Sequence, residues 1–308
     1  MRAAILAACI LIGAIRFACG GECSGNPEAL GTSRVLTVNP SQHSRVGTIQ
    51  YRETLLLNDH EVVLTFDDGP LPPYTARVLD TLASECVKAT FFIIGSMANS
   101  FPKLVRRTYD EGHTIGTHTQ NHPLNIPRLP PAKSEKDVKD GIASVRAVLA
   151  DAYAIAPFFR FPGLGRKAAV EDYLISRGIM VWSADLVADD WKHISAQEVI
   201  SRALQRLEEK RKGVLLLHDI QPATALALPE LLRELKQRGY QVVHVVPASD
   251  RPTIGSEPQQ QFLHKVVNPP WPHVVGETTE SPLRNTHTLI PIPRPSPIRP
   301  PLSIQPGG

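Results

Sequence analysis

Two adjacent aspartates, Asp67 and Asp68, follow directly on the apolar run VVLTF at 62–66. This run is typical of a buried strand, yet two ionised neighbours at its end repel each other and lose solvation close to a core. A cation or another positive group must therefore face them. The side chains that could hold or supply it follow other apolar runs of the same chain.

His118 and His122 are four residues apart, so on a single helical turn both imidazoles would face the same way. Together with one aspartate they make two histidines and a carboxylate, a set of three protein ligands that leaves one position on a metal open for water. Zinc suits this set, and cobalt, nickel and manganese are alternatives because nitrogen and oxygen donors select weakly among them. The sequence predicts one divalent metal ion.

Further polar side chains stand at the ends of other apolar runs. They are Arg160, the pair Asp189 and Asp190, Trp191, and the pair His218 and Asp219. Because sites in parallel α/β folds form where the strands end, we expect these side chains to gather at one rim. A histidine, with an ordinary pKa of about 6.5, is suited to give or take a proton near neutral pH.

Apolar runs and amphipathic stretches alternate between residues 55 and 249. Seven runs are expected to be strands: 62–66, 89–95, 114–118, 158–161, 179–185, 213–219 and 241–246. Six stretches between them are expected to be helices: 74–85, 102–111, 134–151, 166–177, 195–211 and 224–238. This alternation indicates an α/β fold with a parallel sheet, either barrel-like or doubly wound.

The two ends of the chain differ from this core. Residues 1–20 contain an apolar stretch with the length of a secretory signal peptide, which predicts export to the periplasm or the cell exterior; an uncleaved membrane anchor is the alternative. Residues 21–54 are interpreted as a polar, partly ordered lead-in. Residues 250–308 are interpreted as a proline-rich disordered tail, with contacts through the tail as a less favoured alternative to an inert linker.

The net charge bears on nucleic-acid binding, and the cysteine content bears on a possible disulfide. A net charge of +3 without a basic stripe gives no support for nucleic-acid binding. If the signal peptide is removed, Cys23 and Cys86 remain as an even pair in an oxidising compartment. A disulfide between them is one option that the spacing alone does not decide.

Five short segments together resemble the motifs of the polysaccharide deacetylases, the carbohydrate esterase family that includes chitin and peptidoglycan N-acetylglucosamine deacetylases and nodulation chitooligosaccharide deacetylases. They are TFDDGP (65–70), HTQNH (118–122), RFPG (160–163), DDW (189–191) and LLLH (215–218). The resemblance covers roughly residues 55–247. It implies a distorted (β/α) barrel of about seven parallel strands with outer helices, a single metal ion, and hydrolysis of an N-acetyl group.

The resemblance also implies a chemical role for each matching residue. Asp68, His118 and His122 would be the metal ligands. Asp67 would be the base that takes a proton from a metal-bound water, and His218 would be the acid.

Other matching residues would support this machinery or contact the substrate. Arg160 would orient Asp67 and would itself be backed by Asp190. Four residues would contact the substrate or its oxyanion: Gly163, Trp191, Leu215 and Leu217. The family usually has an aromatic residue where this chain has Gly163, so the resemblance constrains the substrate range less than the chemistry.

We therefore expect an enzyme that removes N-acetyl groups from a polysaccharide or oligosaccharide containing N-acetylglucosamine, such as a chitooligosaccharide or peptidoglycan. An acetyl-xylan-type O-deacetylase and a non-catalytic carbohydrate-binding module on the same fold are alternatives. A phosphoryl-transfer protein built on the aspartate pair is disfavoured, because the chain has no glycine loop that would cradle a phosphate. No feature indicates a protein partner.

Overall fold

The computed structural model describes residues 23, 25–149, 151 and 154–248 of the 308-residue chain. The expected signal peptide at 1–20 and the expected proline-rich tail at 250–308 lie outside the described residues. Within the described part, none of the helices has the length and apolarity that a membrane span requires.

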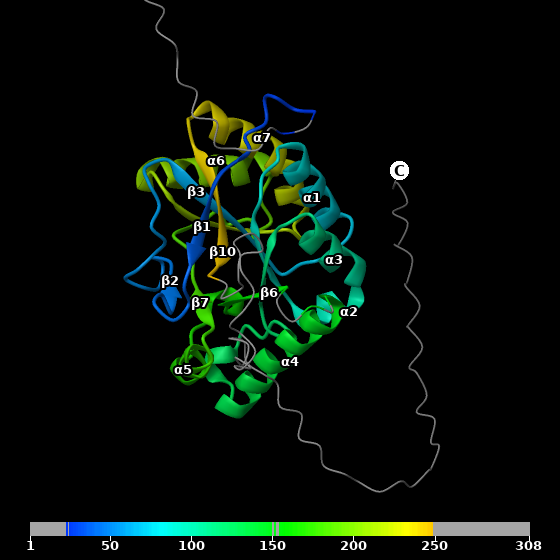
Figure 1. The fold of residues 1–308 in the computed structure, drawn as a ribbon, viewed down its shortest axis with the longest axis vertical. Coiled ribbons are helices and arrows are strands. Elements are labelled where there is room, and N and C mark those ends of the chain that lie inside the picture. Colours follow the sequence, from blue (N-terminus) through cyan, green and yellow to red (C-terminus); the bar gives the residue numbers. More distant parts are fainter. Residues whose placement is uncertain (1–22, 24, 150, 152–153, 249–308) are drawn as a thin grey trace, which may run out of the picture. The chain divides into compact units, whose positions relative to one another are not determined.

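Ten strands form one sheet in the described part of the chain, and all of their pairings are parallel (Figure 1). The strands are β1 (Thr32–Val38), β2 (Arg45–Val46), β3 (Glu61–Asp67), β4 (Thr90–Ile93), β5 (Thr114–Thr117), β6 (Ile155–Arg160), β7 (Met180–Trp182), β8 (Leu186–Val187), β9 (Gly213–His218) and β10 (Gln241–Pro247). The hydrogen-bonded order is β1-β10-β3-β4-β5-β6-β7-β2, with β9 paired to β3 and β8. Among these residues no pairing joins β1 to β2, so hydrogen bonds do not close the barrel there.

Seven α-helices of the described chain lie outside the strands (Figure 1). They are α1 (Tyr74–Ser84), α2 (Gly95–Ser100), α3 (Pro102–Asp110), α4 (Pro131–Leu149), α5 (Ala168–Ser176), α6 (Ala196–Lys210) and α7 (Pro222–Gln237). Every predicted strand and helix is present with shifted ends, and β1, β2, β8 and α2 are additions. The predicted α/β class, with parallel strands and outer helices, is confirmed.

Two of the additional strands come from the segment at 21–54, which the sequence indicated to be only partly ordered. β1 pairs with β10 along its whole length, and β2 pairs with β7. Val38 is the only buried residue of β1, and β2 is only two residues long. Neither strand therefore produces the continuous apolar run by which buried parallel strands are recognised.

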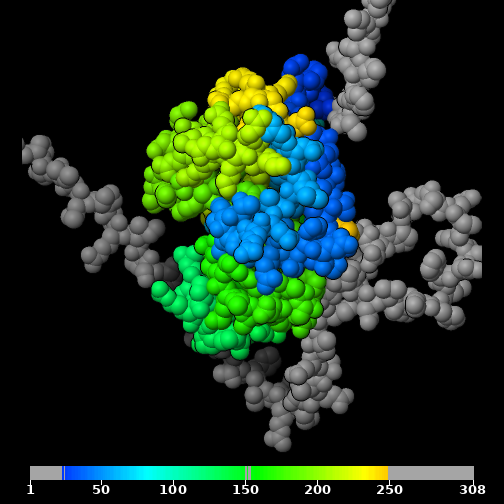
Figure 2. All heavy atoms as spheres, turned by 90° about the vertical axis from the view of Figure 1, so that its left-hand side faces the viewer, coloured from blue at the N-terminus to red at the C-terminus, as the bar shows by residue number. Residues whose placement is uncertain are grey.

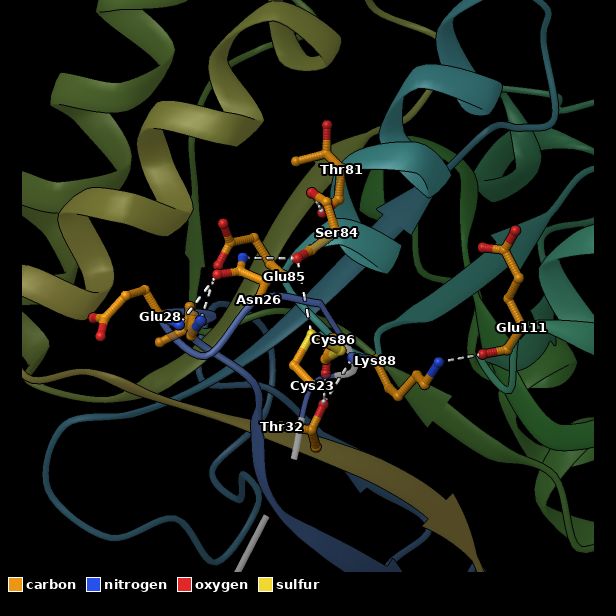
Figure 3. The surroundings of a disulfide bond; sticks show 11 residues. Cys23, Asn26, Glu28, Thr32, Thr81, Ser84, Glu85, Cys86, Lys88 and Glu111 are labelled. Carbon is orange, nitrogen blue, oxygen red and sulfur yellow. Dashed lines mark hydrogen bonds between the residues drawn. A yellow bond between two sulfur atoms is a disulfide. The ribbon is translucent and has the colours of Figure 1, made fainter. Parts of the chain in front are cut away.

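A disulfide joins Cys23 to Cys86 and so connects the segment before β1 to the residues that follow α1 (Figure 3). Hydrogen bonds support the same junction: Asn26 donates to the carbonyl oxygen of Ser84 at 3.0 Å, and the Leu30 amide donates to the Glu85 carboxylate at 2.8 Å. The cysteine pairing that the sequence left open is thus present in the structure.

Side chains of β3 alternate between two environments, and this alternation positions the site. Val62, Leu64 and Phe66 pack in a cluster that includes residues of α1, α6 and α7. Val63 packs in a second cluster, which contains strand and lead-in residues and no helix residue. Because the period of a strand is two, Asp67 lies on the same inner side as Val63, at the strand's carboxyl end.

Candidate active site

The two residues expected to exchange protons stand side by side at the rim of the barrel. Asp67 is the last residue of β3 and His218 is the last residue of β9, and the two are direct partners in the register of these strands. One layer below, Thr65 is the partner of Leu216. Neighbours in a parallel register point to the same side, so Asp67 and His218 both belong to the inner side.

The three expected metal ligands come together beside them. One ligand atom from each of Asp68, His118 and His122 lies within 4.8 Å of the other two. Asp68 Oδ1 is 3.3 Å from Nε2 of His118 and 3.0 Å from Nε2 of His122. The structure thus gathers two nitrogens and one oxygen around a single point.

The donor chemistry of this cluster fits a cation. His118 Nδ1 lies 2.7 Å from the carbonyl oxygen of Arg160, which can only accept, so Nδ1 carries the proton and the Nε2 lone pair faces Asp68. Asp68 Oδ1 is buried and has no hydrogen-bond partner. Burial would raise the pKa of Asp68, but when the two imidazoles that face it are protonated they lower this pKa below its usual range, and a metal cation in place of their protons would act in the same direction. Lone pairs directed at one place suit a divalent metal.

The expectation that His118 and His122 share a helical turn is wrong. His118 follows β5 in a loop, and both Thr119 (φ 67°) and His122 (φ 54°) adopt left-handed backbone conformations. The His122 amide donates to the Thr119 hydroxyl at 3.1 Å, and Asp137 of α4 accepts from the amides between the two histidines. A tight loop, not a helix, brings the imidazole rings to 5.0 Å from each other.

Arg160 lies against Asp67, as expected. Its Nη1 donates to Asp67 Oδ1 at 2.7 Å and to the Thr65 hydroxyl at 2.8 Å, and its guanidinium lies over the ring of Phe92 at 4.2 Å. Arg160 is fully buried, and the other oxygen of Asp67, Oδ2, is 3.9 Å from His118 Nε2. One carboxylate oxygen is therefore fixed while the other faces the ligand cluster.

Asp190 was expected to back Arg160, but it holds His218 instead. Asp190 Oδ1 is 2.8 Å from His218 Nδ1, and Oδ2 accepts from the His218 amide at 2.7 Å and from the Thr224 hydroxyl at 2.6 Å. The reason is topological: β8 pairs with β9, so the loop after β8 lies on the His218 side of the rim. In the place expected for Asp190, Arg160 Nη2 donates to the carbonyl oxygen of Ser183 at 2.9 Å.

The surroundings of His218 favour its protonated form. Burial alone would lower the pKa of His218, but the hydrogen bond and charge of Asp190, with Asp68 and Asp67 nearby, raise it to about 9. His218 Nε2 is 4.0 Å from Asp68 Oδ2, so its free N–H is directed toward the ligand cluster. A proton donor thus stands beside the metal ligands.

Asp219, the neighbour of His218 in the sequence, contacts a different element of the fold. It is buried and accepts from the Thr75 hydroxyl at 2.5 Å, so it connects the end of β9 to the start of α1. Burial is the main cause that raises the pKa of Asp219 to about 7. Asp189, which precedes Asp190 in the sequence, does not bind His218 either; its carboxylate binds Arg202 and Arg206 of α6.

Leu215 and Leu217 do not line the site. Both are fully buried in the cluster that β9 shares with α1, α6 and α7. Leu216, between them, is the register partner of Thr65 and lies on the inner side beneath His218. The period of two along a strand was the signal in the sequence that could have identified Leu216.

Trp191 and Gly163 are at the rim. Trp191 is 46% exposed, and its ring meets the His218 ring edge-on at 5.8 Å. Gly163 (φ 54°) is in the short turn Pro162–Leu164 that follows β6. A side chain at Gly163 would approach the exposed Leu124, since an added Cβ would be 3.0 Å from Leu124 Cδ2.

Sequence comparisons agree with this geometry. Residues 57–182 match the family model described as polysaccharide deacetylase. A peptidoglycan N-acetylglucosamine deacetylase of Bacillus cereus is 34% identical over 193 residues, which are 61% of this chain and 87% of that protein. The chain belongs to the polysaccharide deacetylase family.

Other polysaccharide deacetylases match with similar strength. The peptidoglycan N-acetylglucosamine deacetylase PgdA of Listeria monocytogenes is 35% identical over 186 residues, and the match spans 60% of this chain and 38% of that protein's length. The peptidoglycan deacetylase Bd3279 of Bdellovibrio bacteriovorus is a solved structure with a TM-score of 0.63 and 30% identity, over 70% of this chain and 59% of that one. Asp190 and His218 lie beyond the segment that the polysaccharide deacetylase model matches.

Proposed function

We propose that this polysaccharide deacetylase is a metal-dependent hydrolase that removes the N-acetyl group from N-acetylglucosamine units of peptidoglycan or a related polysaccharide. The observation that carries the proposal is the cluster of Asp68, His118 and His122, with their ligand atoms within 4.8 Å, between the side chains of Asp67 and His218. The names of the matching relatives support peptidoglycan as the substrate.

Asp68, His118 and His122 would hold the metal, for which we propose zinc. When bound there, a divalent cation would supply a Lewis acid that lowers the pKa of water and polarises the amide carbonyl. Asp67 accepts the proton of the attacking water through the oxygen that Arg160 leaves free. Arg160 fixes the other oxygen at 2.7 Å, so the base does not turn away.

His218 acts on the leaving group. Its Nδ1–H is bound to Asp190, so the proton available to the substrate is at Nε2. As the C–N bond breaks, this proton passes to the nitrogen, and the products are acetate and a free amine. An amine departs poorly without protonation, and a histidine with a pKa of about 9 remains charged at neutral pH.

A non-catalytic carbohydrate-binding module would not need the two pairs of a carboxylate and a basic side chain that we observe. Arg160 is held on Asp67 and His218 is held on Asp190, both by hydrogen bonds shorter than 3 Å. Such pairs position a base and an acid, whereas binding a glycan requires neither.

Acetate release from the purified chain tests the proposal. Peptidoglycan, chitooligosaccharides and acetylated xylan are incubated with the enzyme as purified, after chelation, and after zinc is restored. We expect release from peptidoglycan or chitooligosaccharide, loss of release with chelator, and recovery with zinc. Release from xylan alone would favour the O-deacetylase, and zinc-bound protein without release from any substrate would favour the binding module.

We further propose that the protein works outside the cytoplasm. The disulfide between Cys23 and Cys86 supports this location, because such bonds persist in oxidising compartments, where a cell-wall substrate is also found. Trapping of thiols in intact cells should show Cys23 and Cys86 unlabelled before reduction. Labelling of both in the native protein would contradict the proposal.

A further inference from the structure

Residues 45–54 pass along the outside of the barrel and contact two features of the proposed site: the backbone that binds Arg160 and the turn that carries Gly163. They precede the segment 57–182 that the family model matches. β2 lies beside β7, with Val46 as the register partner of Trp182. In Figure 2 this light-blue segment lies on the surface directly against the green part of the chain. Two sets of contacts connect it to the residues that hold the chemistry.

The first set reaches the base. The Ser183 amide donates to the carbonyl oxygen of Val46 at 2.7 Å, and the Ser183 carbonyl oxygen accepts from Arg160 Nη2 at 2.9 Å. Arg160 in turn donates to Asp67 at 2.7 Å. The backbone of a single residue, Ser183, therefore separates the segment from the arginine that orients the proposed base.

Gly47 makes this close approach possible. Its φ is +107°, and an added Cβ would lie 2.6 Å from the Ala184 nitrogen and 2.7 Å from the Ser183 carbonyl carbon. Both are backbone atoms, which cannot turn aside as a flexible side chain can. Any residue other than glycine here must displace the peptide that supports Arg160.

The second set reaches the turn that carries Gly163. Gln50 Nε2 donates to the carbonyl oxygen of Leu164 at 2.5 Å, and Arg166 Nη1 donates back to the Gln50 carbonyl oxygen at 3.3 Å. Arg166 is itself fixed by an ion pair with the buried Glu171 at 2.6 Å. The turn Pro162–Leu164 is thus tied to the segment on its outer side.

We infer that residues 45–54 position the active site from outside the matched family segment, holding Arg160 through Ser183 and the Gly163 turn through Gln50. Gly47 and Gln50 are its positioning residues. The inference rests on the proposed function, in which Asp67 takes the proton, and on the role that the family resemblance implies for Gly163, whose amide would meet the oxyanion. Both groups act in the transition state, so their displacement should lower kcat more than it raises KM.

Gln50 offers the cleaner test, because its side chain can be changed without a collision. In Gln50→Ala, and in Gln50→Glu, which keeps the length but loses the donor, we expect kcat to fall about tenfold with KM within threefold. Amide hydrogen exchange of the peptide covering 161–167 should become faster in both. The matched control is Gln42→Ala, an exposed glutamine just before the segment, whose change should alter neither quantity.

Gly47→Ala tests the other support, with Gly25→Ala as its control. Gly25 has a similar φ of +93° but nothing within 4 Å of an added Cβ, so it reports the backbone strain alone. We expect kcat to fall at least tenfold in folded Gly47→Ala and to stay within twofold in Gly25→Ala. Wild-type kcat in Gln50→Ala and Gly47→Ala would overturn the inference. Hydrogen exchange does not depend on acetate release, so it tests the inference separately from the proposed function. If residues 161–167 exchanged at the wild-type rate in Gln50→Ala, the inference would be overturned. If the wild-type protein released no acetate, only the proposed function would fail.

Discussion

Asp67 and Asp68 are neighbours in the sequence but meet different partners, because the strand ends between them. Asp67 is the last residue of β3 and points inward to Arg160 at 2.7 Å. Asp68 has a left-handed backbone (φ 77°) that turns its carboxylate to His118 and His122. Adjacent carboxylates can therefore divide the work of base and metal ligand.

This division predicts opposite outcomes for two matched substitutions. Asp67→Asn removes the base but no ligand, so turnover should fall by a factor of about 10² to 10⁴ while zinc affinity stays the same. Asp68→Asn removes a ligand charge and should weaken zinc binding by more than the roughly 10- to 100-fold that a lost supporting hydrogen bond costs. Isothermal titration with zinc and acetate release measure the two quantities. An equal loss of zinc in both variants would refute the division.

Asp190→Asn should change the pH dependence of the reaction. Asp190 raises the pKa of His218, so its loss lowers that pKa, and His218 gives up its proton at a lower pH. The alkaline limb of the kcat profile should move toward neutral pH by about one unit or more. Asp189→Asn is the control, because its carboxylate binds Arg202 and Arg206 instead. Unmoved limbs in Asp190→Asn would exclude this role.

At the scale of elements, the two sides of β9 perform separate tasks. Leu217 faces the helices and Leu216 faces the inner side. Leu217→Ala should therefore lower the free energy of unfolding by about 2–5 kcal/mol without changing the KM of the folded protein. Leu216→Ala should raise KM or lower kcat at a similar loss of stability. Denaturant unfolding and steady-state kinetics distinguish them, and identical kinetics would place both leucines outside the site.

Periodicity predicted the elements that have long apolar runs or amphipathic faces, which is why all six expected helices and β3, β9 and β10 are where the sequence put them. It did not reveal β1, whose residues are mostly half-buried, or the two-residue β2 and β8. The spacing of His118 and His122 identified the ligand pair but not its backbone, because a tight loop and a helical turn both bring residues four apart together. Pairing of Asp190 with His218 depends on which strands are neighbours, and local sequence does not contain that information.

For the whole molecule, the disulfide between Cys23 and Cys86 spans 63 residues and secures the segment that leads into β1. Closing a loop of this size should stabilise the fold by about 4 kcal/mol in the chain-entropy account. The Cys23→Ser, Cys86→Ser double variant should lose that amount in denaturant unfolding, with kcat unchanged because the bond is remote from the ligand cluster. A variant as stable as the wild type would show that other contacts hold this segment.

Two buried histidines, His113 and His244, lie away from the active-site rim. The Ala89 amide donates to His113 Nδ1 at 3.2 Å, so this nitrogen holds a lone pair. The Thr114 hydroxyl donates to the Val245 carbonyl oxygen at 2.7 Å and therefore accepts from His244 Nε2 at 2.9 Å. Burial first, and the nearby Lys88 second, lower the pKa of His113 to about 3; burial and Lys88 lower that of His244 to about 4. Both imidazoles are thus neutral in the folded protein.

These lowered pKa values predict that stability falls on the acid side of neutrality. Below about pH 6.5 the unfolded chain takes up protons that the folded His113 and His244 refuse, so the free energy of unfolding should drop by about 1.4 kcal/mol per pH unit for each histidine down to about pH 4.5. His218 adds no slope there, because its raised pKa leaves it protonated in both states. Asp219 offsets one of the two histidines, because its carboxyl, with a pKa raised to about 7, keeps in the folded protein a proton that the unfolded chain releases. Urea unfolding with chelator present measures the slope. The slope should decrease by about 1.4 kcal/mol per pH unit in His113→Gln or His244→Gln and stay unchanged in His43→Gln, a histidine near the surface. A full slope in the double variant His113→Gln, His244→Gln would assign the acid sensitivity to other groups.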